Sequence, residues 1–304
     1  MRTSRAIWPI AYLIALFIVP CAQAQTLVLK RAFIEKYKNR ATIDATFVVD
    51  HAHPHPNPPS ADGDLHAAGR STEIGLPMVS EVMNAGQSSQ TPVVHDLQGR
   101  QGNSQAAPIT GAWRIWFEHP SQAPQIQFDP VAPAGNTNPA HCFEIHPITK
   151  FNGKDVSGSF QNIPGFTPHP ASTSFGSYEK MTLTVSSTDT AVTITSKKAG
   201  FNYVEFFAEP LGTPQSLDDG GSVILANVLE DDDADVLVDN VRLVFVPGTD
   251  PAQVIKSSGS AAKLHLIGIP RVSLSALSTW LAASGAGTVT RKLPYEIIVV
   301  AVLK

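Results

Sequence analysis

The sequence predicts an all-β protein with a few short helices, built as two small barrel-like domains. Three observations support this fold class. Proline and glycine are frequent, at 24 and 21 of 304 residues, whereas charged residues make up only 16%. Apolar and polar residues alternate over short stretches bounded by turn residues, which is typical of strands with one buried face. Stretches with helical periodicity are few.

Eleven stretches carry the strand signal, and the first shows it most clearly. In "ATIDATFVVD", the residues Ile43, Ala45 and Phe47 share one face, because side chains two apart on a strand point to the same side. The predicted strands cover residues 41–50, 77–83, 109–118, 141–148, 181–187, 191–196, 202–209, 222–229, 235–246, 262–269 and 295–303.

Three stretches favour helices, at residues 30–39, 171–180 and 273–284. Residues 151–170 are rich in Gly, Pro, Asn and Ser, which marks a boundary between domains. We therefore predict a first domain at residues 25–150, a linker at 151–170 and a second domain at 171–304.

Five-stranded Greek-key barrels of the OB type fit this pattern, with a long first loop "DHAHPHPNPPSADGD" at residues 50–64. The two halves also echo each other. The segments "VSEVMN", "AWRIWFEHP" and "CFEIHPITKF" are followed in the same order by "VEFFAEP", "VRLVFVPGT" and "LHLIGIPRVSL". A duplication would explain the echo. The polar positions of the first copy are apolar or absent in the second, which places any site in residues 25–150.

The amino terminus has the pattern of a secretory signal. Residues 1–24 contain a basic start, an apolar run and the small-x-small motif Ala22, Gln23, Ala24. The apolar run is too short for a membrane span. We therefore expect an exported protein, periplasmic or secreted, whose mature chain begins near Gln25.

The composition limits the partners. Of 22 basic residues, Arg2 and Arg5 leave with the signal, so 20 basic residues remain against 26 acidic ones. A net charge of about −6 gives no general attraction to nucleic acid or anionic lipid. If nucleic acid binds, it would have to contact the basic segment 30–40 or Trp116. Only Cys142 survives processing, which excludes an internal disulfide.

Two polar pairs stand at strand spacing in the first half. Asp64 and His66 share one strand face, and Glu144 and His146 share another. If the two strands lie close together, two carboxylates and two imidazoles meet. This ligand set suits zinc or manganese. We therefore predict Asp64, His66, Glu144 and His146 as metal ligands.

Glu81 in "PMVSEVM" supports a functional site most strongly. It shares a strand face with Val79 and Met83, and a buried carboxylate is costly without a partner. That partner would be Arg70, a histidine or a metal ion. In an enzyme, Glu81 or Glu144 would be the catalytic carboxylate, acting as general base beside a histidine.

Each of these features also has an ordinary structural explanation. Asp62-Gly63-Asp64 is common turn chemistry, the alternating polar residues fit the wet face of a strand, and Pro147 can simply end one. If a pocket exists, Asp62 would be a binding residue at its turn.

Two further motifs are weaker. The strand "AWRIWF" places Trp116 beside Arg114, which would make a stacking platform for a base or sugar, and packing in the core is the alternative. The three histidines of "HAHPHP" at residues 51–56 lie on an extended loop, where adventitious metal binding is expected.

The motifs of the first half resemble a family of uncharacterised exported bacterial proteins. These proteins share D-G-D-x-H, an apolar V-x-E segment and E-[IL]-H-P. Here the motifs are Asp62 to His66, Glu81 in "MVSEVMN", and Glu144 to Pro147 in "CFEIHPI". The resemblance covers much of the first half and continues weakly into the second. It implies an OB-like fold and a site in the first half, and it implies no reaction.

The sequence therefore predicts an exported ligand-binding module with a polar, metal-binding pocket in the first domain. A metal-dependent hydrolase of phosphodiesters is the first alternative, because a bound ion can activate water. A purely structural or protein-interaction module is the second. The Gly-rich phosphate loop, the G-x-S-x-G elbow and the H-E-x-x-H helix do not occur, which excludes several common enzyme classes.

Overall fold

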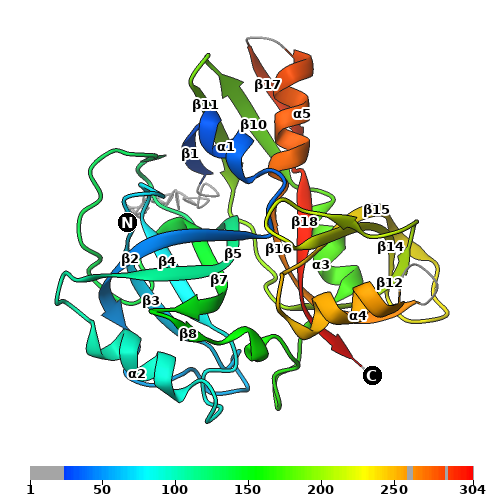
Figure 1. Cartoon of the computed structure of the whole chain (residues 1–304). Helices are drawn as coiled ribbons and strands as arrows, with labels where there is room; N and C mark the ends of the chain where they lie inside the picture. Colours follow the sequence, from blue (N-terminus) through cyan, green and yellow to red (C-terminus); the bar gives the residue numbers. More distant parts are fainter. Residues whose placement is uncertain (1–23, 259–262, 285–286, 304) are drawn as a thin grey trace, which may run out of the picture.

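The structure is a computed structural model that describes residues 24–258, 263–284 and 287–303. The predicted signal peptide, residues 1–24, lies outside this part except for Ala24. Two barrels stand side by side, and a third sheet lies above them (Figure 1). The all-β class and the barrel-like domains are confirmed. No helix in the three described ranges is long and apolar enough to cross a membrane.

The first barrel closes through five strands in the order β2-β3-β4-β7-β5, with β5 returning to β2. β4 and β7 are parallel, and all other neighbours are antiparallel. This is the 1-2-3-5-4-1 order of an OB-type barrel. Its elements are β2 (Thr42–Ala52), β3 (Leu65–Arg70), β4 (Met78–Val82), α2 (Thr91–Gly99), β5 (Ala106–His119), β7 (His141–Phe151) and the short β8 (Lys154–Asp155).

The second barrel repeats this topology. Its strands close in the order β12-β14-β15-β18-β16, with β15 and β18 as the parallel pair and a helix between the third and fourth strands. Its elements are β12 (Val204–Pro210), β14 (Ser222–Leu229), β15 (Val236–Phe245), α4 (Asp250–Ser258), β16 (Leu264–Val272) and β18 (Tyr295–Leu303), with β9 (His169–Pro170) and β13 (Gln215–Ser216) at the edges.

Equivalent ion pairs support the repeat. Arg114 on β5 stands opposite Glu144 on β7, and Arg271 on β16 stands opposite Glu296 on β18. The predicted pairing of segments is wrong, by two barrel strands for β4 and by one for β5 and β7, because β4, β5 and β7 correspond to β15, β16 and β18. The strands β10 and β11 precede β12 in the chain but belong to the third sheet. Matching the strands of the two halves in chain order therefore misaligns the second barrel.

The third sheet draws strands from both halves of the chain. It runs in the order β17-β10-β11-β1-β6, so the predicted domains at 25–150 and 171–304 share one sheet. Its strands are β1 (Ala24–Lys30), β6 (Gln125–Ile126), β10 (Thr182–Ser187), β11 (Ala191–Lys197) and β17 (Thr288–Lys292).

The three predicted helices are present as α1 (Arg31–Tyr37), α3 (Ala171–Tyr178) and α5 (Leu274–Ser284). The helices α2 and α4, each nine residues long, are not predicted by periodicity. Each has a proline as its second residue, Pro92 or Pro251. A proline tolerated in the first helical turn is the sequence signal that could have found them. One further turn is the 3-10 helix η1 (Ser157–Ser159).

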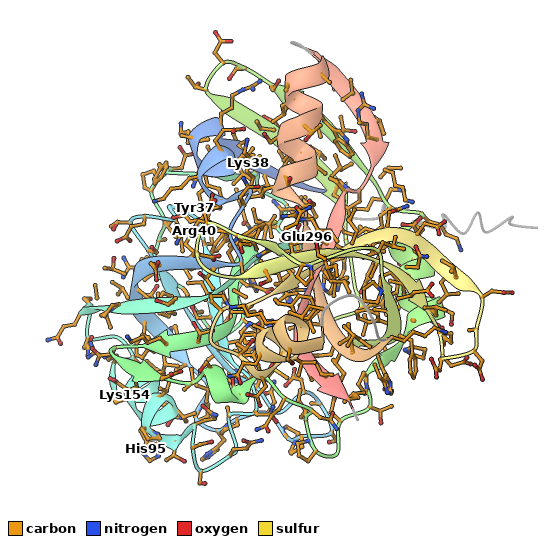
Figure 2. All side chains as sticks on the ribbon, turned by 45° about the vertical axis from the view of Figure 1, so that its right-hand side comes forward. Tyr37, Lys38, Arg40, His95, Lys154 and Glu296 are labelled. Atoms are coloured by element: carbon orange, nitrogen blue, oxygen red, sulfur yellow. The ribbon has the colours of Figure 1, made fainter. Side chains whose placement is uncertain are left out.

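Apolar side chains fill both barrels and also the space between them. Along β7, Phe143 and Ile145 point into the main core, so Glu144 and His146 point out of the barrel. A smaller apolar cluster joins Met83 of the first barrel to Val244 and Ile298 of the second. Figure 2 shows Arg40 and Glu296 near the junction of the barrels, whereas His95 and Lys154 lie at the far end of the first barrel. The outer face of β7, which carries Glu144 and His146, is therefore buried.

Candidate metal centre

The polar group lies on the outer face of three adjacent strands of the first barrel. β3 and β4 pair His66 with Glu81, and the parallel pair β4 and β7 sets Val79 beside Glu144. Two residues further along both strands, Glu81 and His146 become neighbours. The three side chains form a row across the sheet, and Asp64, two residues before His66, joins from the same side.

Three of these residues could hold an ion. Asp64, Glu81 and His146 are buried, and each offers a ligand atom within 4.8 Å of the others. His146 Nδ1 lies 3.4 Å from Glu81 Oε2, and His146 Nε2 lies 3.2 Å from Asp64 Oδ2. Carboxylate and imidazole ligands in this number fit zinc or manganese.

Two atoms of this group lack a partner. Asp64 Oδ1 and His146 Nδ1 are buried and have no hydrogen bond within the described ranges. The same holds for both ring nitrogens of His66. Buried polar atoms are almost always hydrogen-bonded in native structures, so three such residues in one group require an explanation. A coordinated cation would provide it.

His66 links the group to the surface. Its Nε2 lies 3.4 Å from Glu81 Oε2, and its ring stacks on His53, with centroids 4.9 Å apart. The His66 side chain is 12% exposed, more than that of any other member of the group. Burial lowers the pKa of His53. The neutral imidazole of His53 therefore covers the outer side of the site.

Tyr203 reaches the site from the second half of the chain. Its hydroxyl donates to Asp64 Oδ2 and lies 2.9 Å from His146 Nε2. Because the phenol has one proton, His146 must donate from Nε2 to the Tyr203 oxygen. That assignment leaves Nδ1 as the nitrogen available to an ion. Tyr203 has a left-handed φ of 52°, a strained conformation for a bulky residue.

The electrostatics show an excess of negative charge. Burial raises the pKa of Asp64 and of Glu81, because nothing nearby fully compensates either charge. Burial alone would lower the pKa of His146, yet the carboxylates of Glu81, Asp64 and Glu144 raise it well above its usual range. A divalent cation would take the place of these protons.

Glu144 lies at the edge of this group, with its Oε2 3.5 Å from His146 Nδ1, but Arg114 and His141 hold its carboxylate. Burial would raise its pKa, but the Arg114 guanidinium holds that pKa well below its usual range. Arg114 Nη1 donates to Glu144, and His141 Nε2 lies 3.0 Å from its other oxygen. His119, His141 and Glu144 also have the spacing of a metal-ligand group. Of the four predicted ligands, Asp64, His66 and His146 therefore lie together. The second carboxylate beside them is Glu81 and not Glu144.

The side chains of two predicted binding residues, Asp62 and Arg70, are engaged outside the group. Asp62 accepts hydrogen bonds from Asn57 and from the Asp64 backbone, so it holds the turn. Arg70 is not the partner of Glu81, because its guanidinium is bound to Asp50.

The stacking platform predicted at Trp116 is wrong. The Trp116 side chain is 1% exposed and packs edge-on against Tyr178, with centroids 5.4 Å apart. Its Nε1 donates to the Gly200 carbonyl at 3.3 Å. Residues of the second half cover this face, so Trp116 is a core residue.

Sequence reasoning missed Tyr203 and His141. Tyr203 carries no local signal, since it lies 139 residues from Asp64. His141 is the first residue of "HCFEIHPI" and lies three residues before Glu144, with which it shares a hydrogen bond across the start of β7.

The second barrel lacks the group. By the strand registers, Val223, Val244 and Ile298 occupy the places of His66, Glu81 and His146. All three are buried in the cluster between the barrels. With the corrected pairing of strands, the expectation that polar positions of the first copy become apolar holds for His66, Glu81 and His146. It does not hold for Glu144, whose equivalent is Glu296.

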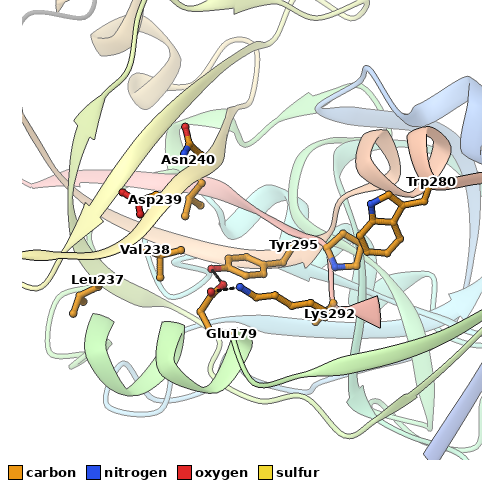
Figure 3. A pocket seen from close by; sticks show the side chains of 11 residues that line it. Glu179, Leu237, Val238, Asp239, Asn240, Trp280, Lys292 and Tyr295 are labelled. Atoms are coloured by element: carbon orange, nitrogen blue, oxygen red, sulfur yellow. Dashed lines mark hydrogen bonds and ion pairs between the residues drawn. The ribbon is translucent and has the colours of Figure 1, made fainter. Parts of the chain in front are cut away.

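A separate cavity of about 410 Å³ lies between β15 and the segment of α5 and β17 (Figure 3). Its acid Glu179 is engaged by Lys292 and accepts a hydrogen bond of 2.9 Å from Tyr295. None of the buried unpartnered atoms described above belongs to its lining. This cavity is therefore a weaker candidate than the polar group.

Comparison with protein-family models and with curated proteins gave no match.

Proposed function

We propose that this protein binds a divalent cation, zinc or manganese, through Asp64, Glu81 and His146, with His66 as the fourth ligand. The observation that carries the proposal is the set of unpartnered buried atoms on Asp64, His66 and His146. Two carboxylates and two neutral imidazoles would neutralise the ion and complete a tetrahedral set.

The burial of the ligands supports a closed site. The ion would tie β3, β4 and β7 together, and Tyr203 would hold Asp64 and His146 in place from the second half of the chain. We place this protein outside the cytoplasm, in the periplasm or the medium, on the signal pattern of residues 1–24. The family resemblance stays a prediction, and Asp64 and His146 are the motif residues that the proposal uses.

The metal-dependent hydrolase is the second candidate, favoured by the partial exposure of His66. An open coordination position on that side would admit water beside Glu81. Hydrolysis of an activated phosphodiester by metal-loaded protein, abolished in Glu81→Gln, is the result expected of an enzyme. Unchanged turnover in that variant would remove Glu81 as the general base.

The test is metal analysis of untagged protein together with calorimetric titration of the chelator-treated protein with zinc and manganese. Near-stoichiometric metal in the wild type, lost in Asp64→Asn and His146→Ala, is expected. The matched control is His265→Gln, which removes a histidine paired with Glu205 at 2.8 Å in the second barrel.

A His55→Ala variant removes the exposed histidine of the "HAHPHP" segment, whose His53 stacks on His66, and should keep the ion. Wild-type protein that takes up no metal, or site variants that still bind it as tightly as the control, would overturn the proposal. The structural or interaction module would then be the remaining alternative.

A further inference from the structure

An open cavity of about 680 Å³ lies where the end of β5, the start of β7 and the end of β11 meet. Glu118 and His119 line it from β5, Asn138 from the loop before β7, and Lys197 and Lys198 from the end of β11. Its size is that of a small-molecule site. None of the proposed metal ligands lines it.

The two lysines are uncompensated. Neither Lys197 nor Lys198 has an ion pair or a side-chain hydrogen bond in the described part of the chain, and both are exposed at the cavity. The acid of the lining, Glu118, is already bound to Arg114 Nη2 at 2.9 Å. The cavity therefore offers cations without a matching anion.

The wall behind the cavity adds a further cation. The His141 ring stacks on the His119 ring, with centroids 4.8 Å apart. His141 Nδ1 lies 2.7 Å from the Pro139 carbonyl, and its Nε2 lies 3.0 Å from the Glu144 carboxylate. Since both partners are acceptors, both nitrogens donate and the ring is an imidazolium.

The charges can be counted. Four cations, Arg114, His141, Lys197 and Lys198, stand against two carboxylates, Glu118 and Glu144. The excess of two positive charges contrasts with the net charge of −4 for the whole chain. An excess of this size matches the dianionic form of a phosphate group.

We infer that this cavity binds a small molecule carrying a phosphate group, held by Lys197 and Lys198 beside His119. Lysine binds phosphate as a point charge and needs no fixed geometry, which suits two flexible side chains at a rim. Burial lowers the pKa of His119, so its ring does not add to the charge. The site is independent of the proposed metal centre.

The test uses the full mature chain in a phosphate-free buffer, with inorganic phosphate and phenyl phosphate as probes in calorimetric titration. The variant Lys197→Ala/Lys198→Ala should weaken binding of both probes by about tenfold or more. The charge-preserving variant Lys197→Arg/Lys198→Arg should retain most of the affinity. Binding should also weaken as salt increases.

Lys150→Ala is the matched control, since it removes an exposed lysine of β7 that has no partner in the described ranges. It should bind both probes as the wild type does. Wild-type protein that binds neither probe would overturn the inference. An equal loss of affinity in Lys150→Ala would also overturn it, because the lysine pair would then contribute only to overall charge.

Discussion

Arg114 and Arg271 occupy equivalent positions in the two barrels, and each donates a hydrogen bond to the residue that precedes the other. Arg114 Nε donates to the Pro270 carbonyl at 3.0 Å, and Arg271 Nη1 donates to the Trp113 carbonyl at 2.9 Å. The fourth strands of the two barrels are thus joined reciprocally. The equivalent arginines of the two repeats therefore lie at the interface between the barrels.

Replacing Arg271 by Met should destabilise the protein by about 3–5 kcal/mol, because it removes a buried partner of Glu296. Arg271 also donates to the Ala41 carbonyl, which would lose its donor. Urea unfolding measures the effect. The control is Arg242→Met, which removes the more exposed partner of the same carboxylate. Equal losses in the two variants would contradict a special role for the buried arginine.

Replacing Tyr203 by Phe should weaken zinc or manganese binding by about 10- to 100-fold, because the hydroxyl orients Asp64 and His146. The control is Tyr178→Phe, which removes another buried hydroxyl, one that donates to the Phe201 carbonyl. Both variants should lose stability, and Tyr203→Phe alone should lose affinity. Titration of each variant with metal distinguishes them. An unchanged affinity in Tyr203→Phe would show that its hydroxyl only fills space.

Replacing Trp116 by Ala should cost about 3–5 kcal/mol in the free energy of unfolding, the range for a large buried aromatic side chain. Metal binding should not change, since Trp116 does not contact the site. Thermal unfolding and metal titration on the same samples test both statements. A stable variant with altered binding would return Trp116 to the list of ligand-binding residues.

Asp96 provides a pH-dependent prediction. Burial opposes ionisation, but Lys154, Asn152 and Arg100 lower the pKa of Asp96 from 3.8 to about 2. The folded protein therefore binds this proton less readily than the unfolded chain. The resulting stability is present above pH 4 and is lost as the pH falls from about 4 to about 2.

Asp96→Asn should accordingly lower stability at neutral pH by about 1–2 kcal/mol, a value reduced because Lys154 is partly exposed. The difference between wild type and variant should shrink towards pH 2. Urea unfolding at a series of pH values measures it. A difference that stays constant over this range would mean that the carboxylate's charge does not contribute.

Eleven of the eighteen strands and three of the five α-helices in the described residues could be predicted from the chain alone, because alternation and periodicity are local properties. The expectation that Glu81 is buried and needs a partner also followed from its neighbours Val79 and Met83. The sequence could not show which way that face points. The strand face lies outside the barrel, and it is buried because Phe160, Ile163 and residues of the second half pack beside it.

Which groups meet is decided by tertiary structure. Spacing along β7 made Glu144 and His146 equal candidates, yet Arg114 on the next strand takes Glu144 and leaves His146 to Asp64 and Glu81. The sequence by itself determined the strands, their faces and the residues with suitable chemistry. Only the closure of the barrel and the arrival of Tyr203, 139 residues from Asp64, decided which of them share one buried site. The physical reason is that local sequence sets the direction of a side chain, whereas the distance between two charges depends on how remote segments pack.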